Sequence, residues 1–435
     1  MSKIWRLLNG SVNRKKLLMR KSGTFSRRLG RYGFEAGQSL PAALIALAVG
    51  SLLLTPFLAF VSSRSLGTGT AQEAFNELYA ADAGVEYGIW SLLKDDPFRS
   101  QVDLNAGTAQ PLAFLPGSVN GFTPIISVTA LPIGNWFLRQ FAPAVIDMGG
   151  SLAYAGGDRV YALRGNGTSG FGYYSISGKF WDSLAPTPDP VGEGGSLVHG
   201  DGNYLYALQG SQGKNKRTFW RYNIDSNSWT PMASTLEDIG KGGSLVYPGE
   251  DFIYALGNKN SFWRYNINED TWSNRHNTPG NVGDGAALVS TGGNTIYAFE
   301  GNSTVFWRYR IASDSWNSMQ PAPGKATKGS ALAYFGGSYL YGLQGNSTGF
   351  MRYNIAGDNW TFLTETPSDV GDGGSLVFTH SEGGYAFRGG NQTDFWEFEV
   401  TPPRYDISVQ AGSVSTDARI EIDGGTNTIL FWDID

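Results

Sequence analysis

Six tryptophans in this chain are each followed by a leucine sixteen residues later. The pairs are Trp136/Leu152, Trp181/Leu197, Trp229/Leu245, Trp272/Leu288, Trp316/Leu332 and Trp360/Leu376. Successive tryptophans are separated by 45, 48, 43, 44 and 44 residues, which is the length of one four-stranded repeat. The abundance of glycine (59 residues) and of aromatic residues (14%) argues against a solenoid of paired helices. The spacing therefore predicts an array of small antiparallel sheets.

Each repeat contains four short runs of β-forming residues, separated by turns rich in Gly, Asn and Ser. In the second complete repeat these runs are 195–199, 204–208, 219–224 and 227–232. Aromatic residues occupy both faces of the third run, which is favourable only where a sheet is packed between two neighbours. A β-propeller provides that environment, and we expect it to occupy residues 131–400.

The first and last repeats together predict how the ring closes. The last repeat ends near Phe398 without a tryptophan in a fourth run. The segment 135–139, which contains Trp136, precedes the first complete repeat at the regular spacing. We expect this segment to be the outer strand of the last sheet, because the pairing removes the open strand edges at both ends of the ring. Six blades follow.

The succession Tyr-Ala-Leu, a Gly-Asn turn, aromatic-Trp-Arg-Tyr and a later Trp resembles kelch repeats over residues 135–398. Kelch repeats carry a double glycine after the second strand, which only Gly389-Gly390 matches fully here. Kelch-like propellers include enzymes similar to galactose oxidase, whose copper chemistry requires a cysteine-linked tyrosine and histidine ligands. This chain has no cysteine, and its three histidines occupy non-equivalent positions. We therefore expect no enzyme activity, no cofactor and no metal.

Carboxylates also recur just before the tryptophans. They are Asp225, Asp270, Asp314 and Asp358. A sialidase-like propeller would require catalytic carboxylates and a cluster of arginines. A simpler interpretation is that each aspartate lies in the turn between the third and fourth strands, where its side chain hydrogen-bonds the backbone.

The N-terminal region has a different composition. Residues 1–33, a basic leader, contain ten Lys or Arg and no acidic residue, so that with a net charge of −5 the rest of the chain carries −15. Residues 40–61 contain no charged residue. This order favours a transmembrane helix at 34–66, with the N-terminus in the cytoplasm and the C-terminus outside. A membrane is thus an expected partner, whereas the acidic remainder argues against nucleic acid.

An amphipathic helix is predicted between residues 71 and 93, until Asp96-Pro97 ends the pattern. Its apolar residues recur at steps of three and four: Phe75, Leu78, Ala81, Val85, Ile89 and Leu92. Strands are expected at 122–130, 405–411, 418–422 and 429–434, with a hairpin turn at 423–425. We expect the segments 67–130 and 401–435 to form a small α+β domain into which the propeller is inserted.

An apolar helix that continues into an amphipathic half and is followed by an antiparallel sheet resembles a type IV pilin. Segments 37–40 (Gly-Gln-Ser-Leu) and 79–87 (Tyr-Ala-Ala-Asp-Ala-Gly-Val-Glu-Tyr) are similar to those of minor pilins and pilus-assembly proteins. The resemblance implies cleavage between Gly33 and Phe34 by a prepilin peptidase, and contacts with other pilin subunits. The family's glutamate at the fifth position after the cut is Gln38 here, and an amide cannot form its ion pair. An uncleaved anchor is the alternative.

The candidate binding site consists of residues placed four positions before the six leucines, which the propeller would gather at one mouth of its channel. They are Met148, Glu193, Lys241, Asp284, Lys328 and Asp372. The five charged members alternate in sign. They form either a ring of weak salt bridges between blades or a polar rim that binds a glycan, a peptide or a cation.

Together these features predict a single-pass protein of the cell membrane, or a minor pilin of a pilus, that displays an extracellular propeller for adhesion or recognition. The step from fold to ligand rests on analogy. Two alternatives stay open. One is an exported propeller enzyme, in which buried His, Arg or carboxylates would converge at one channel mouth, and the other is a structural cap of a pilus that binds nothing.

Overall fold

The computed structural model describes residues 68–104, 106–211, 216–379, 383–423 and 426–434. The chain divides into two units, one made of Met1–Ile133 and Pro402–Asp435 and the other of Gly134–Thr401. The predicted transmembrane helix at 34–66 and the cleavage site Gly33/Phe34 lie outside the described residues. Within the described ranges, no helix is both long enough and apolar enough to span a membrane.

This finding contradicts the prediction of a single-pass membrane protein with an extracellular propeller. The longest helix described is α3 (Thr68–Lys94). It carries Glu73, Glu77, Asp82 and Glu86, and carboxylates spread along a helix oppose its burial in hydrocarbon. This helix corresponds to the amphipathic helix predicted at 71–93, and it packs on a sheet.

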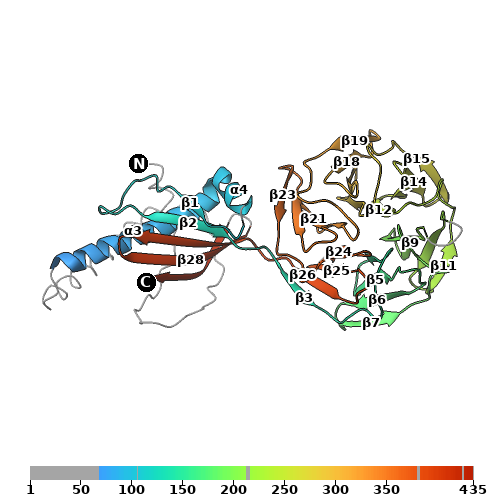
Figure 1. Cartoon of the computed structure of the whole chain (residues 1–435), viewed down its shortest axis with the longest axis horizontal. Helices are drawn as coiled ribbons and strands as arrows, with labels where there is room; N and C mark the ends of the chain where they lie inside the picture. The colour runs from blue at the N-terminus through green and yellow to red at the C-terminus, as the bar shows by residue number, and fades with distance from the viewer. Residues whose placement is uncertain (1–67, 105, 212–215, 380–382, 424–425, 435) are drawn as a thin grey trace. The chain divides into compact units, whose positions relative to one another are not determined.

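The first unit is a helix packed on a five-stranded antiparallel sheet (Figure 1). After α3 come α4 (Asp96–Leu104), β1 (Gln110–Leu112) and β2 (Ile125–Ala130), and at the end of the chain β27 (Arg404–Ala411), β28 (Val414–Asp423) and β29 (Thr426–Ile434). The strand order is β1-β2-β27-β28-β29. Helix α3 buries Ala81, Val85 and Leu92 against this sheet, which is the face predicted from the periodicity.

Two glycines of α3 bring the helix close to the sheet. A Cβ atom at Gly84 would lie 2.5 Å from Val409, and one at Gly88 would lie 2.9 Å from Ile407. The helix does end near Asp96-Pro97, but a second helix begins there. Asp95 accepts a hydrogen bond from the backbone N of Phe98 at 3.1 Å and caps α4, and proline is tolerated in a first helical turn.

The second unit is inserted between two neighbouring strands of the first. Strand β2 pairs with β27, from Ile125 opposite Gln410 to Ala130 opposite Tyr405. The chain leaves after β2, forms the whole second unit and returns as β27.

Six four-stranded antiparallel sheets form the second unit. The first blade is β4 (Ser151–Tyr154), β5 (Arg159–Leu163), β6 (Phe171–Ser175) and β7 (Phe180–Ser183); the second is β8 (Ser196–His199), β9 (Tyr204–Leu208), β10 (Phe219–Asn223) and β11 (Ser228–Pro231). The third is β12 (Ser244–Gly249), β13 (Phe252–Leu256), β14 (Phe262–Asn266) and β15 (Thr271–Asn274); the fourth is β16 (Ala287–Ser290), β17 (Thr295–Phe299), β18 (Phe306–Arg310) and β19 (Ser315–Ser318). The fifth is β20 (Ala331–Tyr334), β21 (Tyr339–Leu343), β22 (Phe350–Asn354) and β23 (Asn359–Phe362); the sixth is β24 (Ser375–Thr379), β25 (Gly383–Phe387), β26 (Phe395–Glu399) and β3 (Asn135–Leu138).

The blades close into a ring (Figure 1). Each innermost strand contacts that of the next blade, and β24 of the sixth blade contacts β4 of the first. The predicted mainly β, propeller-like fold is confirmed. The predicted closure is also confirmed, because β3 pairs with β26 and places Trp136 opposite Phe398.

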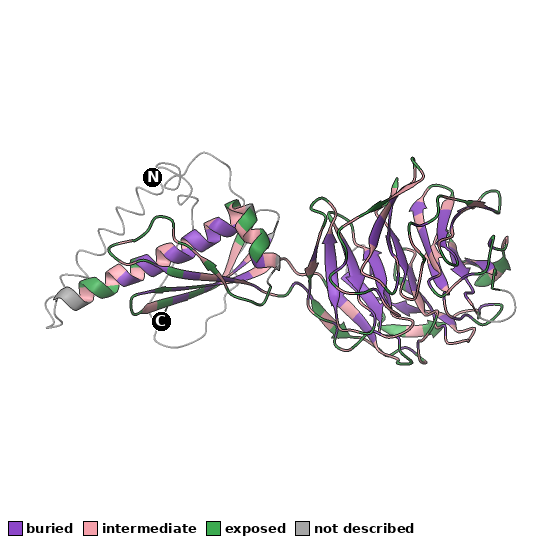
Figure 2. Ribbon diagram, turned by 45° about the horizontal axis from the view of Figure 1, so that its top comes forward, coloured by how far each residue is buried: buried purple, intermediate pink, exposed green. Residues whose placement is uncertain are grey.

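The six repeated tryptophans connect neighbouring blades at the outer strands. Each indole Nε1 donates a hydrogen bond of 2.9–3.0 Å to a backbone oxygen that follows the outer strand of the preceding blade. The pairs are Trp136 to Thr364, Trp181 to Gln140, Trp229 to Ala185, Trp272 to Ala233, Trp316 to His276 and Trp360 to Gln320. The repeated leucines lie buried in the innermost strands. Figure 2 shows this gradient, with buried inner strands and exposed residues along the outer strands and turns.

The turn role predicted for the aspartates is confirmed in three repeats. Asp270 Oδ1, for example, accepts hydrogen bonds from Tyr265 Oη at 2.7 Å and from the backbone N of Ala233 at 2.8 Å. Asp314 and Asp358 bond in the same way. In the second repeat this role belongs to Asn227 and not to Asp225, because Asn227 holds the equivalent position two residues before the tryptophan.

Candidate site at the channel mouth

The predicted site residues lie in the six loops that enter the innermost strands, and the backbones of these loops touch. A glycine follows each site residue. A Cβ atom at Gly329 of the fifth blade would lie 2.0 Å from the carbonyl oxygen of Gly371 in the sixth, and one at Gly373 would lie 2.1 Å from that of Asp147 in the first. These close approaches require glycine. They hold the six loops in a closed ring around the channel.

Hydrogen bonds between innermost strands fix the same region. At four of the six blade junctions a serine Oγ accepts a bond of 3.0 Å from the backbone N of a repeated leucine in the next blade. The serines are Ser151, Ser196, Ser244 and Ser375, and their donors are Leu197, Leu245, Leu288 and Leu152. The side chains at the mouth therefore project from a rigid support.

Four of the five charged residues are brought together by ion pairs. Lys328 Nζ lies 3.0 Å from Asp372 Oδ2 and 3.8 Å from Glu193 Oε1. Lys241 Nζ lies 3.5 Å from Glu193 Oε1. Lys328 belongs to the fifth blade and Glu193 to the second, which are opposite each other in a six-membered ring. This ion pair therefore crosses the channel.

The fifth charged residue, Asp284, is coupled to the others through space. The hydrogen bond to Asp372 raises the pKa of Lys328 above its usual value; partial burial opposes this, and attraction by Asp372, Glu193 and Asp284 adds to it. Lys328 is thus protonated at neutral pH. The carboxylate of Asp284 makes no hydrogen bond or ion pair with any residue in the described ranges. We call these five residues, Glu193, Lys241, Asp284, Lys328 and Asp372, the channel rim.

The rim is open to solvent. The side chains of Lys241 and Lys328 are 60% and 38% exposed, and that of Glu193 is 21% exposed. Ion pairs this accessible each contribute about 0–1 kcal/mol to stability, so the fold does not depend on them. Met148, the uncharged sixth member of the set, is also exposed. The rim carries three carboxylates and two ammonium groups, which leaves one negative charge in excess.

The rim does not form a metal site. Over the ranges that the structure describes, no group of three or more His, Cys, Asp or Glu side chains could hold a metal ion. Lys328 lies between Glu193 and Asp372 and occupies the place that a cation would take. The alternative of a cation bound by the three carboxylates therefore lacks a suitable arrangement of ligands.

No protein-family model and no curated protein matches this chain. Among solved structures, the chain is similar to one titled "Structure of YjhT", with 14% identity, a TM-score of 0.47, and coverage of 67% of this chain and 99% of that one. It is also similar to a novel fungal alcohol oxidase of the AA5 family in complex with copper, with 10% identity, a TM-score of 0.44, and coverage of 64% of this chain and 77% of that one.

The prediction that the chain is not an enzyme is contradicted by these neighbours, one of which is an alcohol oxidase. Its activity and its copper are not carried over to this chain. Whether the propeller described here has catalytic capacity depends on its own residues, above all on the carboxylates of the rim.

Proposed function

We propose that the channel rim is a recognition site for a polar ligand, a glycan or a peptide, carried on a pilin-like unit. The observation that supports this most directly is the ion pair between Lys328 and Glu193 across the channel. It draws charges from opposite blades into one small area, where a ligand can contact all of them at once. Binding sites commonly combine a few such convergent polar groups with a rigid support.

The arrangement of the rim indicates where a ligand would bind. Asp284 has an unsatisfied carboxylate, and Lys241 is largely exposed and held only by Glu193. A ligand hydroxyl or amine can donate to Asp284, and a ligand carboxylate or hydroxyl oxygen can accept from Lys241. Neither contact requires the central ion pairs of Lys328 to break.

The first unit supports the pilin-like part of the proposal. Its helix on an antiparallel sheet, with the last three strands at the end of the chain, is the arrangement that the resemblance implies. Co-expression with a prepilin peptidase tests it. The expected product begins at Phe34 in intact-mass spectrometry, and a chain that keeps residues 1–33 under these conditions would contradict the pilin-like assignment.

A second candidate function is catalysis at the same rim. Glu193 and Asp372 both contact the ammonium group of Lys328, so two carboxylates and a proton donor lie together at the channel mouth. The carboxylates of this set can act as general bases, while Lys328, whose pKa is raised by its hydrogen bond to Asp372, stays protonated and can stabilise negative charge on a ligand. Incubation of a bound ligand with the protein, followed by mass spectrometry of the ligand, distinguishes turnover from binding alone.

Neutralising the rim tests the recognition site. In the full chain, the combined changes Glu193→Gln, Asp284→Asn and Asp372→Asn are expected to abolish binding on an array of glycans and peptides and to leave the melting temperature nearly unchanged. Glu269→Gln, which alters an exposed carboxylate in the β14–β15 turn, is the matched control. A large loss of stability without a separate binding defect would show that the rim is only a ring of salt bridges between blades.

A further inference from the structure

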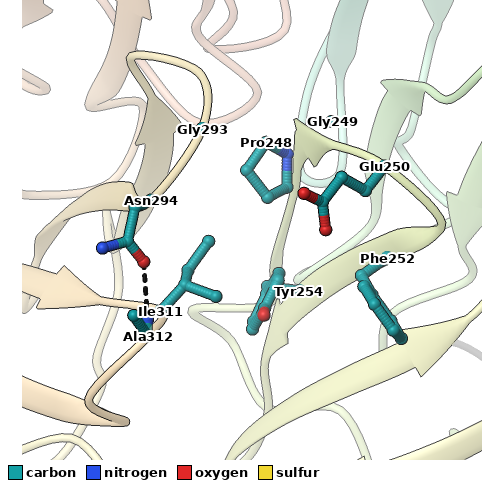
Figure 3. Close-up of a pocket in the computed structure, with 9 residues that line it drawn as sticks. All are labelled: Pro248, Gly249, Glu250, Phe252, Tyr254, Gly293, Asn294, Ile311 and Ala312. Atoms are coloured by element: carbon teal, nitrogen blue, oxygen red, sulfur yellow. Dashed lines mark hydrogen bonds between the residues drawn. The ribbon is translucent and has the colours of Figure 1, made fainter.

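A cavity of about 350 Å³ lies between the third and fourth blades (Figure 3). It lies at the C-terminal ends of β12 and β16, whereas the channel rim lies at the N-terminal ends of these strands. The third blade contributes Glu250, Phe252 and Tyr254, and the fourth contributes Asn294 and Ile311. Its volume lies within the range of small-molecule sites. Figure 3 shows the carboxylate of Glu250 pointing toward the middle of the cavity, between Pro248 and Tyr254.

Glu250 stands where the four other described hairpins have glycine. Five hairpins between first and second strands are described, and four place a glycine at the same left-handed position: Gly157 (φ 69°), Gly202 (φ 61°), Gly293 (φ 61°) and Gly337 (φ 70°). The third blade has Glu250 there, at φ 58°. A side chain at such a φ is strained, and residues held this way concentrate at functional sites. Tyr247 Oη holds the loop by donating to the carbonyl oxygen of Glu250 at 2.5 Å.

One anionic and one cationic side chain lie at the cavity, Glu250 in its lining and Arg264 on the ring of Phe252. The guanidinium of Arg264 lies 4.2 Å from the centre of the Phe252 ring and covers one of its faces. Arg264, Arg275 and Asp314 all act on Tyr254, whose pKa is raised mainly by burial. Among the residues that line the cavity, only Glu250 is charged. The carboxylate of Glu250 disfavours an anionic ligand, and the cation next to Phe252 disfavours an ammonium ligand.

We infer that this cavity binds a neutral sugar ring. The carboxylate of Glu250 can accept hydrogen bonds from two adjacent hydroxyl groups. Phe252 and Ile311, which are both partly exposed, provide an apolar wall for the C–H face of the ring. The amide nitrogen of Asn294 has no partner in the described residues and is a further donor, while its Oδ1 accepts from the backbone N of Ala312 at 2.5 Å. The inference does not depend on the function proposed for the rim.

Saturation-transfer NMR on the full chain tests the inference, with D-glucose, D-galactose, D-mannose and N-acetyl-D-glucosamine as probes. At least one of the four is expected to bind, and Glu250→Gly is expected to weaken that binding at least tenfold. The melting temperature should not fall, because the change installs the residue that four other hairpins use. Lys259→Gly is the matched control, since Lys259 also has a positive φ (55°) but does not line the cavity.

Three results would overturn the inference: no saturation transfer to any of the four sugars, equal binding by Glu250→Gly and the unchanged chain, or stronger binding of choline than of every sugar. The rim variant with Glu193, Asp284 and Asp372 neutralised separates the two proposals. Sugar binding that persists in this variant supports the cavity. Sugar binding that is lost in the rim variant but kept in Glu250→Gly assigns the sugar to the rim and contradicts the cavity.

Discussion

Trp136 offers a quantitative test of how the propeller closes, because an internal tryptophan provides an almost identical comparison. The ring of Trp136 lies 4.9 Å from Phe350, 6.1 Å from Trp396 and 4.9 Å from Phe398. The ring of Trp316 lies 4.9 Å from Phe262, 6.0 Å from Trp307 and 4.9 Å from Tyr309. Both indoles donate to a backbone oxygen of the preceding blade, at 3.0 and 2.9 Å.

We expect Trp136→Ala and Trp316→Ala to destabilise the propeller equally. Truncating a buried tryptophan to alanine costs about 3–5 kcal/mol. Both residues are only partly buried, which favours the lower end, and the lost hydrogen bond adds about 1 kcal/mol. A loss of about 4 kcal/mol corresponds to a melting temperature lower by roughly 10 °C for a domain of this size.

Differential scanning calorimetry of the full chain measures both variants. If segment 135–138 were not the outer strand of the sixth blade, Trp136→Ala would lower the melting temperature by only a degree or two while Trp316→Ala kept its full effect. That difference would refute closure through β3.

Two further predictions concern the loops at the rim and the buried tyrosines. Gly329→Ala should cost more than 2 kcal/mol, since φ is +87° and the new Cβ would lie 2.0 Å from a carbonyl oxygen; Gly336→Ala, at φ +101° with no atom within 4 Å, should cost only about 1 kcal/mol. Equal urea midpoints would refute the close approach of the loops. Burial raises the pKa of Tyr222 from 10.0 to about 12, so its stabilising contribution is complete below pH 10 and is lost between pH 10 and 12. Urea midpoints that stay constant from pH 8 to pH 12 would contradict this.

The blade architecture follows from the sequence because each repeated residue has the same structural role in every blade. The tryptophan marks the outer strand, where its indole bonds the preceding blade, and the leucine marks the buried inner strand. The closing strand β3 carries its tryptophan at the same spacing, so the position of Trp136 in the sequence was sufficient to predict that β3 is the outer strand of the sixth blade. The turn role that was predicted for Asp225 belongs to Asn227 for a simple reason. The turn requires an acceptor two residues before the tryptophan, and the amide oxygen of Asn227 serves as well as a carboxylate.

Other features depend on geometry that the spacing does not contain. Repeat order places Glu193 and Lys328 in opposite blades, but only the channel width and the side-chain conformations bring them within 3.8 Å. The cavity beside Glu250 was not predicted. A signal for it does exist in the sequence, since Glu250 replaces a glycine found at the same position of the other described hairpins. That signal identifies the residue that departs from the repeat, but it does not show that a cavity lies beside it.

The most direct test of the account is a crystal structure of the full chain with the glycan or peptide that the array identifies. The account predicts that this ligand lies at the channel mouth, with polar atoms within hydrogen-bond distance of Asp284 and Lys241 and with the Lys328–Glu193 pair still in place across the channel. A ligand bound only at the outer strands or at the turns between third and fourth strands, with the rim in contact with solvent alone, would contradict it.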